Sequence, residues 1–200
     1  MVGGPVFYYY GNMLKEGCVG VVPTDTVYGL IARALDISAV ERIYQLKNRT
    51  ANKPLIILIN GIETIRGFGI EITAVEHAVL ERIWPGPITV IFPNPVAPIF
   101  SYLHRGGSKL AFRWPASKLL IDLIRENGPL VAPSANPEGE PPAITITEAK
   151  KYFGDQVDFY EPGGHRIGSP STLVELVGTR LKIIRPGAGV VPPDLIYVEV

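Results

Sequence analysis

Cysteine is almost absent from this sequence of 200 residues, and its scarcity excludes a disulfide-stabilised fold. Cys18 is the only cysteine, so no internal disulfide can form, as is usual for proteins of a reducing compartment. None of the three histidines has a cysteine or another histidine at the spacing of a zinc motif. Because Cys18 lies in an apolar stretch, we expect it to be a small core residue of a strand rather than a nucleophile.

An excess of charge of either sign is also absent. Nineteen basic and nineteen acidic residues give a formal net charge of +0, which argues against a broad basic surface for nucleic acid, although a local basic cleft remains open. No apolar segment is long enough to span a bilayer, and residues 1–12 lack the pattern of a signal peptide. We therefore expect a cytoplasmic protein without membrane contact, folded as a single domain over residues 1–200.

Helix and strand signals alternate along the chain and predict an α/β fold with a largely parallel sheet whose last strands are antiparallel. Capping boxes at Ser38, Thr73 and Thr145 predict three helix starts, and apolar spacing predicts a fourth helix over 117–127. Short apolar runs predict strands at residues 18–23, 55–59, 88–92, 110–112, 130–132, 157–160, 173–176 and 181–184. Residues 5–10 also favour a strand locally, and residues 196–200 could add one at an edge.

Residues 19–30 carry the clearest local signal for a ligand site. An apolar run ends at Pro23, which cannot donate to a sheet and therefore closes a strand. Thr24, Asp25 and Thr26 follow, and their oxygen atoms can hold a turn or bind a ligand. Gly29 has no side chain, so the backbone there can come close to another group. A strand, a polar turn and then a helix is where α/β proteins bind ligands, although a simple capped turn explains the same residues.

Three further stretches place polar side chains at the ends of predicted elements. Lys47 and Arg49 would point to the same side of an extended chain and suit a polyphosphate, although basic residues also favour a solvated helix end. Arg113 ends a predicted strand, where it can clamp a carboxylate or phosphate or form a surface ion pair. Ser134 and Asn136 can face one pocket or form a turn at the end of a strand.

Six short motifs, taken in order, resemble the YrdC-like family, the threonylcarbamoyl-AMP synthases. They are Pro-Thr-Asp-Thr-Val-Tyr-Gly-Leu at 23–30, Lys-x-Arg at 47–49 with Pro-Leu at 54–55, Trp-Pro-Gly-Pro-Ile-Thr at 84–89, Arg-x-Pro at 113–115, Ser-x-Asn at 134–136, and Ser-Thr at 171–172 with Arg-x-Gly at 185–187. The resemblance covers residues 19–187, and the order of the motifs is far more specific than any single one.

The sequence departs from the family pattern at three places. Thr50 stands where the family usually has proline, and residues 31–32 are Ile-Ala where Gly-Cys is commoner. Glu138 follows Pro137 in a position where the family usually has serine before glycine. Glu138 therefore adds a negative charge near the ATP site that the resemblance implies.

The resemblance implies a twisted, open, mixed α/β sheet flanked by helices, with a large concave cleft. It implies a nucleotidyltransferase that makes threonylcarbamoyl-AMP and pyrophosphate from L-threonine, bicarbonate or CO2, and ATP, with Mg2+ bound to the ATP and no metal ligands from the protein. The product would serve the t6A modification of tRNA through a downstream transferase. The residues implied to be catalytic are Lys47 and Arg49. Those implied to bind ATP are Lys47, Arg49, Lys53, Ala132, Asn136 and Arg185, and those implied to bind threonine are Thr26, Arg113, Ser134 and Ser171.

Two alternatives remain open from the sequence. One is a YciO-like paralogue that keeps the fold and takes a different substrate, and the other is a non-catalytic domain that binds RNA directly in the same cleft. The intact Lys47, Arg49, Ser134 and Asn136 favour an enzyme over a binding domain, without excluding an altered enzyme. No residue is identified as a general base.

Overall fold

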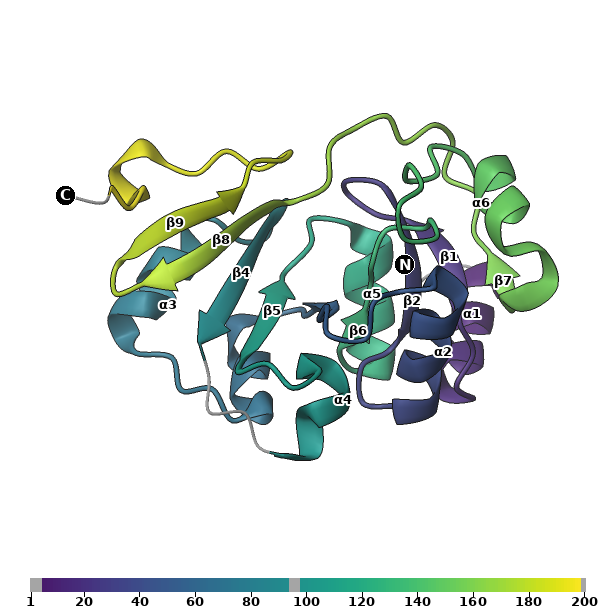
Figure 1. The fold of residues 1–200 in the computed structure, drawn as a ribbon, viewed down its shortest axis with the longest axis horizontal. Coiled ribbons are helices and arrows are strands. Elements are labelled where there is room, and N and C mark those ends of the chain that lie inside the picture. The colour runs from purple at the N-terminus through teal and green to yellow at the C-terminus, as the bar shows by residue number, and fades with distance from the viewer. Residues whose placement is uncertain (1–4, 94–97, 199–200) are drawn as a thin grey trace.

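The computed structural model describes residues 5–93 and 98–198, which form a mixed sheet flanked by helices (Figure 1). The strands are β1 (Gly20–Pro23), β2 (Tyr28–Arg33), β3 (Ile56–Leu58), β4 (Ile88–Pro93), β5 (Lys109–Arg113), β6 (Leu130–Val131), β7 (Phe159–Tyr160), β8 (Thr172–Val177) and β9 (Arg180–Arg185). Their order across the sheet is β7-β1-β2-β6-β3-β5-β4-β8-β9. This architecture confirms the expected mixed α/β sheet flanked by helices.

Most neighbouring strands in the described sheet are antiparallel, so the expectation of a largely parallel sheet is wrong. The antiparallel pairs are β1–β2, β2–β6, β3–β6, β4–β5 and β8–β9, and the parallel pairs are β1–β7, β3–β5 and β4–β8. A parallel arrangement needs a crossover between successive strands, whereas β1 turns back directly into β2. The expected antiparallel arrangement of the last two strands is confirmed.

The helices lie in two layers because neighbouring strand residues point to opposite faces of the sheet. They are α1 (Pro5–Lys15), α2 (Ile37–Lys47), α3 (Ala74–Glu81), α4 (Ser101–His104), α5 (Lys118–Asn127) and α6 (Ile146–Phe153). Val22 and Ile31 belong to a core that includes residues of α1 and α5. Val21 and Leu30 belong to a second core, which includes residues of α2, α3 and α6. No helix in the described ranges is long and apolar enough to cross a membrane.

The predicted helix starts are confirmed at Thr73 and Thr145 and wrong at Ser38. Thr73 makes a complete capping box at the start of α3. Thr145 caps α6, although the carboxylate of Glu148 accepts from the N–H of the residue before Thr145. Helix α2 is capped instead by Asp36, which accepts a first-turn backbone N–H and the hydroxyl of Ser38. A carboxylate at this position is an equally good cap, so the serine is free to support it.

The predictions for the two chain ends are also corrected. Residues 5–10 belong to α1, because packing against α5 and β2 outweighs their local preference for a strand. Near the other end, Ile196 makes only an isolated bridge to Leu181, and residues 199–200 lie outside the described ranges. Cys18 lies before β1, so it is not a strand residue. Its side chain is half-buried and packs against the core that contains Val22 and Ile31.

The close contact between β1 and β7 makes the first residue of β1 sensitive to size. A Cβ on Gly20 would lie 2.1 Å from Cζ of Phe159, which is 5% exposed and stacks on Tyr10 with ring centroids 4.5 Å apart. We predict that Gly20→Ala lowers the free energy of unfolding by about 1–3 kcal/mol, since the ring has no room to yield. Denaturant unfolding measures this change.

Gly67→Ala is the matched control, because a Cβ at Gly67 meets nothing within 4 Å. Its unfolding free energy should stay within about 0.5 kcal/mol of the parent value. Equal losses in the two variants would contradict the packing argument.

Candidate functional site

The turn between β1 and β2 is held by its own threonine. The hydroxyl of Thr24 donates to the carbonyl of Val27 at 2.6 Å and accepts the N–H of Thr26 at 3.0 Å. Thr24 is buried, so its hydroxyl serves the turn. The pairing of Pro23 with Tyr28 carries the chain straight into β2, and the helix expected after Gly29 is therefore wrong.

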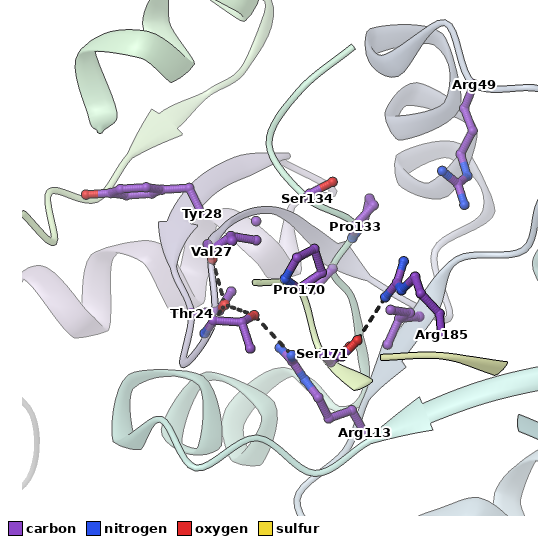
Figure 2. A pocket seen from close by; sticks show the side chains of 14 residues that line it. Thr24, Val27, Tyr28, Arg49, Arg113, Pro133, Ser134, Pro170, Ser171 and Arg185 are labelled. Atoms are coloured by element: carbon purple, nitrogen blue, oxygen red, sulfur yellow. Dashed lines mark hydrogen bonds between the residues drawn. The ribbon is translucent and has the colours of Figure 1, made fainter. Parts of the chain in front are cut away.

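A concave pocket opens beside this turn, at the ends of several strands (Figure 2). Its volume is about 630 Å³, counting the solvent at its mouth. It is lined by Thr24, Thr26, Val27, Tyr28, Gly29, Arg49, Ile56, Arg113, Ala132, Pro133, Ser134, Pro170, Ser171 and Arg185. The charged residues in this lining are three arginines, so the pocket favours an anionic ligand.

Arg113 ends β5 and lies at the inner wall of the pocket with only 4% of its surface exposed. Its Nη2 lies 3.2 Å from Oδ1 of Asp25, and its Nη1 donates to the hydroxyl of Thr26 at 3.2 Å. Burial lowers the pKa of Arg113, and the negative charge of Asp25 opposes that shift. Since arginine remains protonated in proteins, the pocket holds a permanent cation whose fork suits a carboxylate.

Arg185 ends β9 and lines the same pocket (Figure 2). Its Nη2 donates to the backbone carbonyl of Ser171 at 2.9 Å. The hydroxyl of Ser171 is buried and bonds to that of Thr89 at 2.7 Å. The hydroxyl of Ser171 is therefore already engaged at the edge of the pocket, whereas Arg185 presents charge to it.

Lys47 is not part of the pocket lining, and residues 47–49 do not form the extended chain in which it was expected to point to the same side as Arg49. Lys47 is the last residue of α2, and Asn48 then turns the chain with a φ of 48°. Lys47 is 2% exposed, and its ammonium donates to the carbonyls of Ser134 and Asn136, each at 2.5 Å. Burial and the nearby charge of Arg49 lower the pKa of Lys47 to about 7. Its contacts hold the 134–136 turn in place.

Two other predicted ATP ligands lie outside the lining. Asn136 is buried, and its amide donates to the carbonyls of Pro137 and Glu140 at 2.9 and 2.6 Å. Of Ser134 and Asn136, which were expected to face one pocket, Ser134 belongs to the lining and Asn136 does not. The ammonium of Lys53 pairs with the carboxylate of Glu138. The structure thus brings seven predicted residues together: Thr26, Arg49, Arg113, Ala132, Ser134, Ser171 and Arg185.

From the sequence, Tyr28 was given no role, and Asp25 was expected only to hold the turn or bind a ligand. Asp25 pairs with Arg113, a contact between residues far apart in the chain that only the sheet order brings together. The hydroxyl of Tyr28 donates to the carbonyl of Gly164 and accepts the N–H of Gly163, both at 2.8 Å. Tyr28 thereby fixes a distant loop beside the pocket. In the sequence, both residues belong to the motif at 23–30, and Asp25 also belongs to the predicted polar turn.

A mixed α/β sheet with an arginine-lined pocket at its strand ends defines a class of protein whose pocket suits a small anionic ligand. The chain belongs to the Sua5/YciO/YrdC family, whose model, described as "Telomere recombination", matches residues 12–187. This finding confirms the resemblance seen in the motifs.

Curated relatives carry the name of one enzyme. A threonylcarbamoyl-AMP synthase of Pyrococcus abyssi is 37% identical over 88% of this chain, and the chain spans only 52% of that relative. A threonylcarbamoyl-AMP synthase of Cellvibrio japonicus is 32% identical over 91% of the chain and 96% of the relative. The solved structure of P. abyssi Sua5 with L-threonine superposes with a TM-score of 0.82 at 34% identity, covering 90% of this chain and 54% of that one.

The buried contacts of Lys47 lead to a stability prediction. Lys47→Met keeps an unbranched side chain and removes the ammonium, which leaves the carbonyl of Asn136 without its donor. We predict that Lys47→Met lowers the free energy of unfolding by about 1–3 kcal/mol. Substitution of a lysine at a solvated helix end would leave the stability of the fold unchanged.

Thermal or denaturant unfolding of the variant checks this value. Gln45→Ala serves as the control, because Gln45 is exposed on the same helix and should change stability by less than about 0.5 kcal/mol. A fully stable Lys47→Met variant would show that the ammonium contributes nothing to the fold.

Proposed function

We propose that this chain is an L-threonylcarbamoyladenylate synthase, a nucleotidyltransferase. The observation that carries the proposal is the pocket itself, in which Thr26 and three arginines line one cavity in a chain of this family. In the proposed reaction the amine of threonine is carboxylated, either by CO2 with loss of a proton or by bicarbonate with loss of water. The resulting carbamate carboxylate attacks the α-phosphate of ATP. The bond from the α-phosphate to the β-phosphate breaks, and pyrophosphate leaves.

Arg113 is proposed to bind the carboxylate of threonine. Its guanidinium contacts the carboxylate of Asp25 and the hydroxyl of Thr26, so its orientation is fixed before the substrate arrives. Ser134 and Ser171 lie on the walls of the same pocket and would help to orient the amino acid. A guanidinium fixed in this way favours a ligand with a carboxylate, because a carboxylate can accept two hydrogen bonds from its planar fork.

Arg49 and Arg185 are proposed to hold the phosphates, where charge develops as pyrophosphate leaves. Ala132 lines the pocket beside them. Lys47 would act through the 134–136 turn that it holds, and not by contact with the phosphates. Mg2+ would arrive bound to ATP, because Mg2+ commonly binds through substrate phosphates.

The product would be a mixed anhydride, which can pass its threonylcarbamoyl group to a nucleophile. A downstream transferase acting on tRNA, in the cytoplasm, is the proposed consumer. Direct RNA contact is a weaker proposal, since the net charge of +0 provides no broad basic surface.

Pyrophosphate release from ATP tests the proposed function. We predict that release requires L-threonine and bicarbonate together, because the attacking carboxylate forms from both. The assay compares the full mixture with mixtures that lack one component. Release without threonine would indicate simple ATP hydrolysis, and release with another amine would point to a paralogue with a different substrate.

A conservative change at Arg113 tests its proposed role. Arg113→Lys keeps a positive charge for Asp25 and removes the planar fork. We predict that the KM for threonine rises about tenfold to a hundredfold, because a hydrogen bond to a charged group contributes about 1.5–3 kcal/mol. The KM for ATP should change by less than about threefold, or about 0.65 kcal/mol.

Arg125→Lys, at an exposed position of α5, is the control and should leave both KM values unchanged. An Arg113→Lys enzyme with the parent KM for threonine would remove Arg113 from the threonine site.

A further inference from the structure

Two of the three departures from the family pattern contact each other. Thr50 and Glu138 lie 88 positions apart, yet the backbone N–H of Thr50 donates to Oε2 of Glu138 at 2.5 Å. The hydroxyl of Thr50 donates to the same oxygen at 3.0 Å. A proline at position 50 has neither an N–H nor a hydroxyl, so it could make neither contact. The two departures therefore form one interaction.

Glu138 also contacts other residues of the segment 47–53. Its other carboxylate oxygen pairs with the ammonium of Lys53, and its backbone N–H donates to the carbonyl of Lys47 at 2.7 Å. These hydrogen bonds lower the pKa of Glu138 to about 2, so the carboxylate is ionised at neutral pH. We call this set of contacts between Glu138 and residues 47–53 the clasp.

Arg49 lies within the clasped segment. Its Nε donates to the carbonyl of Lys53 and its Nη2 to the carbonyl of Pro54, both at 3.0 Å. The direction of its guanidinium thus depends on the shape of this loop. Arg49 is also one of the three arginines that line the pocket (Figure 2). A more mobile loop would therefore leave the guanidinium of Arg49 less precisely positioned in the pocket.

We propose that Glu138 is a positioning residue, which fixes residues 47–53 so that Arg49 presents its charge to an anionic substrate. The inference rests on the proposed function in that the substrate would be the phosphates of ATP. It also assigns Lys53 as the counter-ion of Glu138 in place of the ATP contact expected from the sequence. Glu138 itself does not line the pocket, so it acts only through the loop.

Glu138→Ala removes the side-chain contacts of the clasp, and kinetics at saturating ATP measure the effect. We predict that kcat falls about tenfold to a hundredfold, because a misplaced contact to developing charge is costly, while the KM for threonine stays unchanged. Glu138→Gln keeps an acceptor for Thr50 and should turn over several-fold faster than Glu138→Ala. Glu140→Ala is the control, since it removes the same charge from an exposed side chain of the same loop and should match the parent.

A double variant shows whether Glu138 acts through Arg49. In an Arg49→Ala background, Glu138→Ala should cause no further loss of kcat, because the positioned group is already gone. Additive losses would overturn the proposal, as would a Glu138→Ala enzyme with the parent kcat.

Amide hydrogen exchange tests the clasp without an activity measurement. The backbone amides of residues 48–53 should exchange faster in Glu138→Ala than in the parent or in Glu140→Ala, at an unchanged melting temperature. If the parent releases no pyrophosphate but this change in exchange is seen, the proposed function fails and the clasp stands as a loop-fixing device. Unchanged exchange in Glu138→Ala overturns the clasp whatever the activity.

Discussion

The pairing of β2 with a neighbour on each side is the constraint on which the pocket depends. This strand pairs with β1 on one side, and on the other its backbone bonds to residues 130–135, including a bond from the N–H of Leu30 to the carbonyl of Pro133 at 2.9 Å. Gly29 allows this approach, because a Cβ there would lie 3.1 Å from Thr24 and 3.4 Å from the Pro133 carbonyl. The pairing sets the polar turn at residues 24–27 beside the end of β6. Both segments then face Arg113 at the end of β5.

Much of the fold could be predicted from the sequence, because most strands are short apolar runs with clear boundaries. The exception was β2, which is buried almost throughout and so shows no alternation that distinguishes a strand from a buried helix. Whether neighbouring strands pair parallel or antiparallel also could not be predicted from the sequence. It depends on which strands become neighbours, and β6 lies between β2 and β3 although many residues separate them in the chain.

The candidate site could be predicted as a set of motifs but not as a geometry. The spacing of Lys47 and Arg49 suggested two side chains on one face, and the left-handed conformation of Asn48 separates them. The alternation of Ser134 and Asn136 suggested a shared pocket, yet local carbonyl groups draw the Asn136 amide away. In both cases polar groups near in sequence or in space competed successfully for hydrogen bonds that had been assigned to a ligand.

The arginine lining has an effect on the electric field of the whole molecule. Three of the nineteen basic residues line the pocket, so the rest of the chain carries sixteen basic against nineteen acidic residues, a balance of −3. The lining of the pocket thus has an excess of positive charge, and the rest of the chain has a slight excess of negative charge. Such a field steers a polyanion toward one opening, and the association rate falls as salt is added.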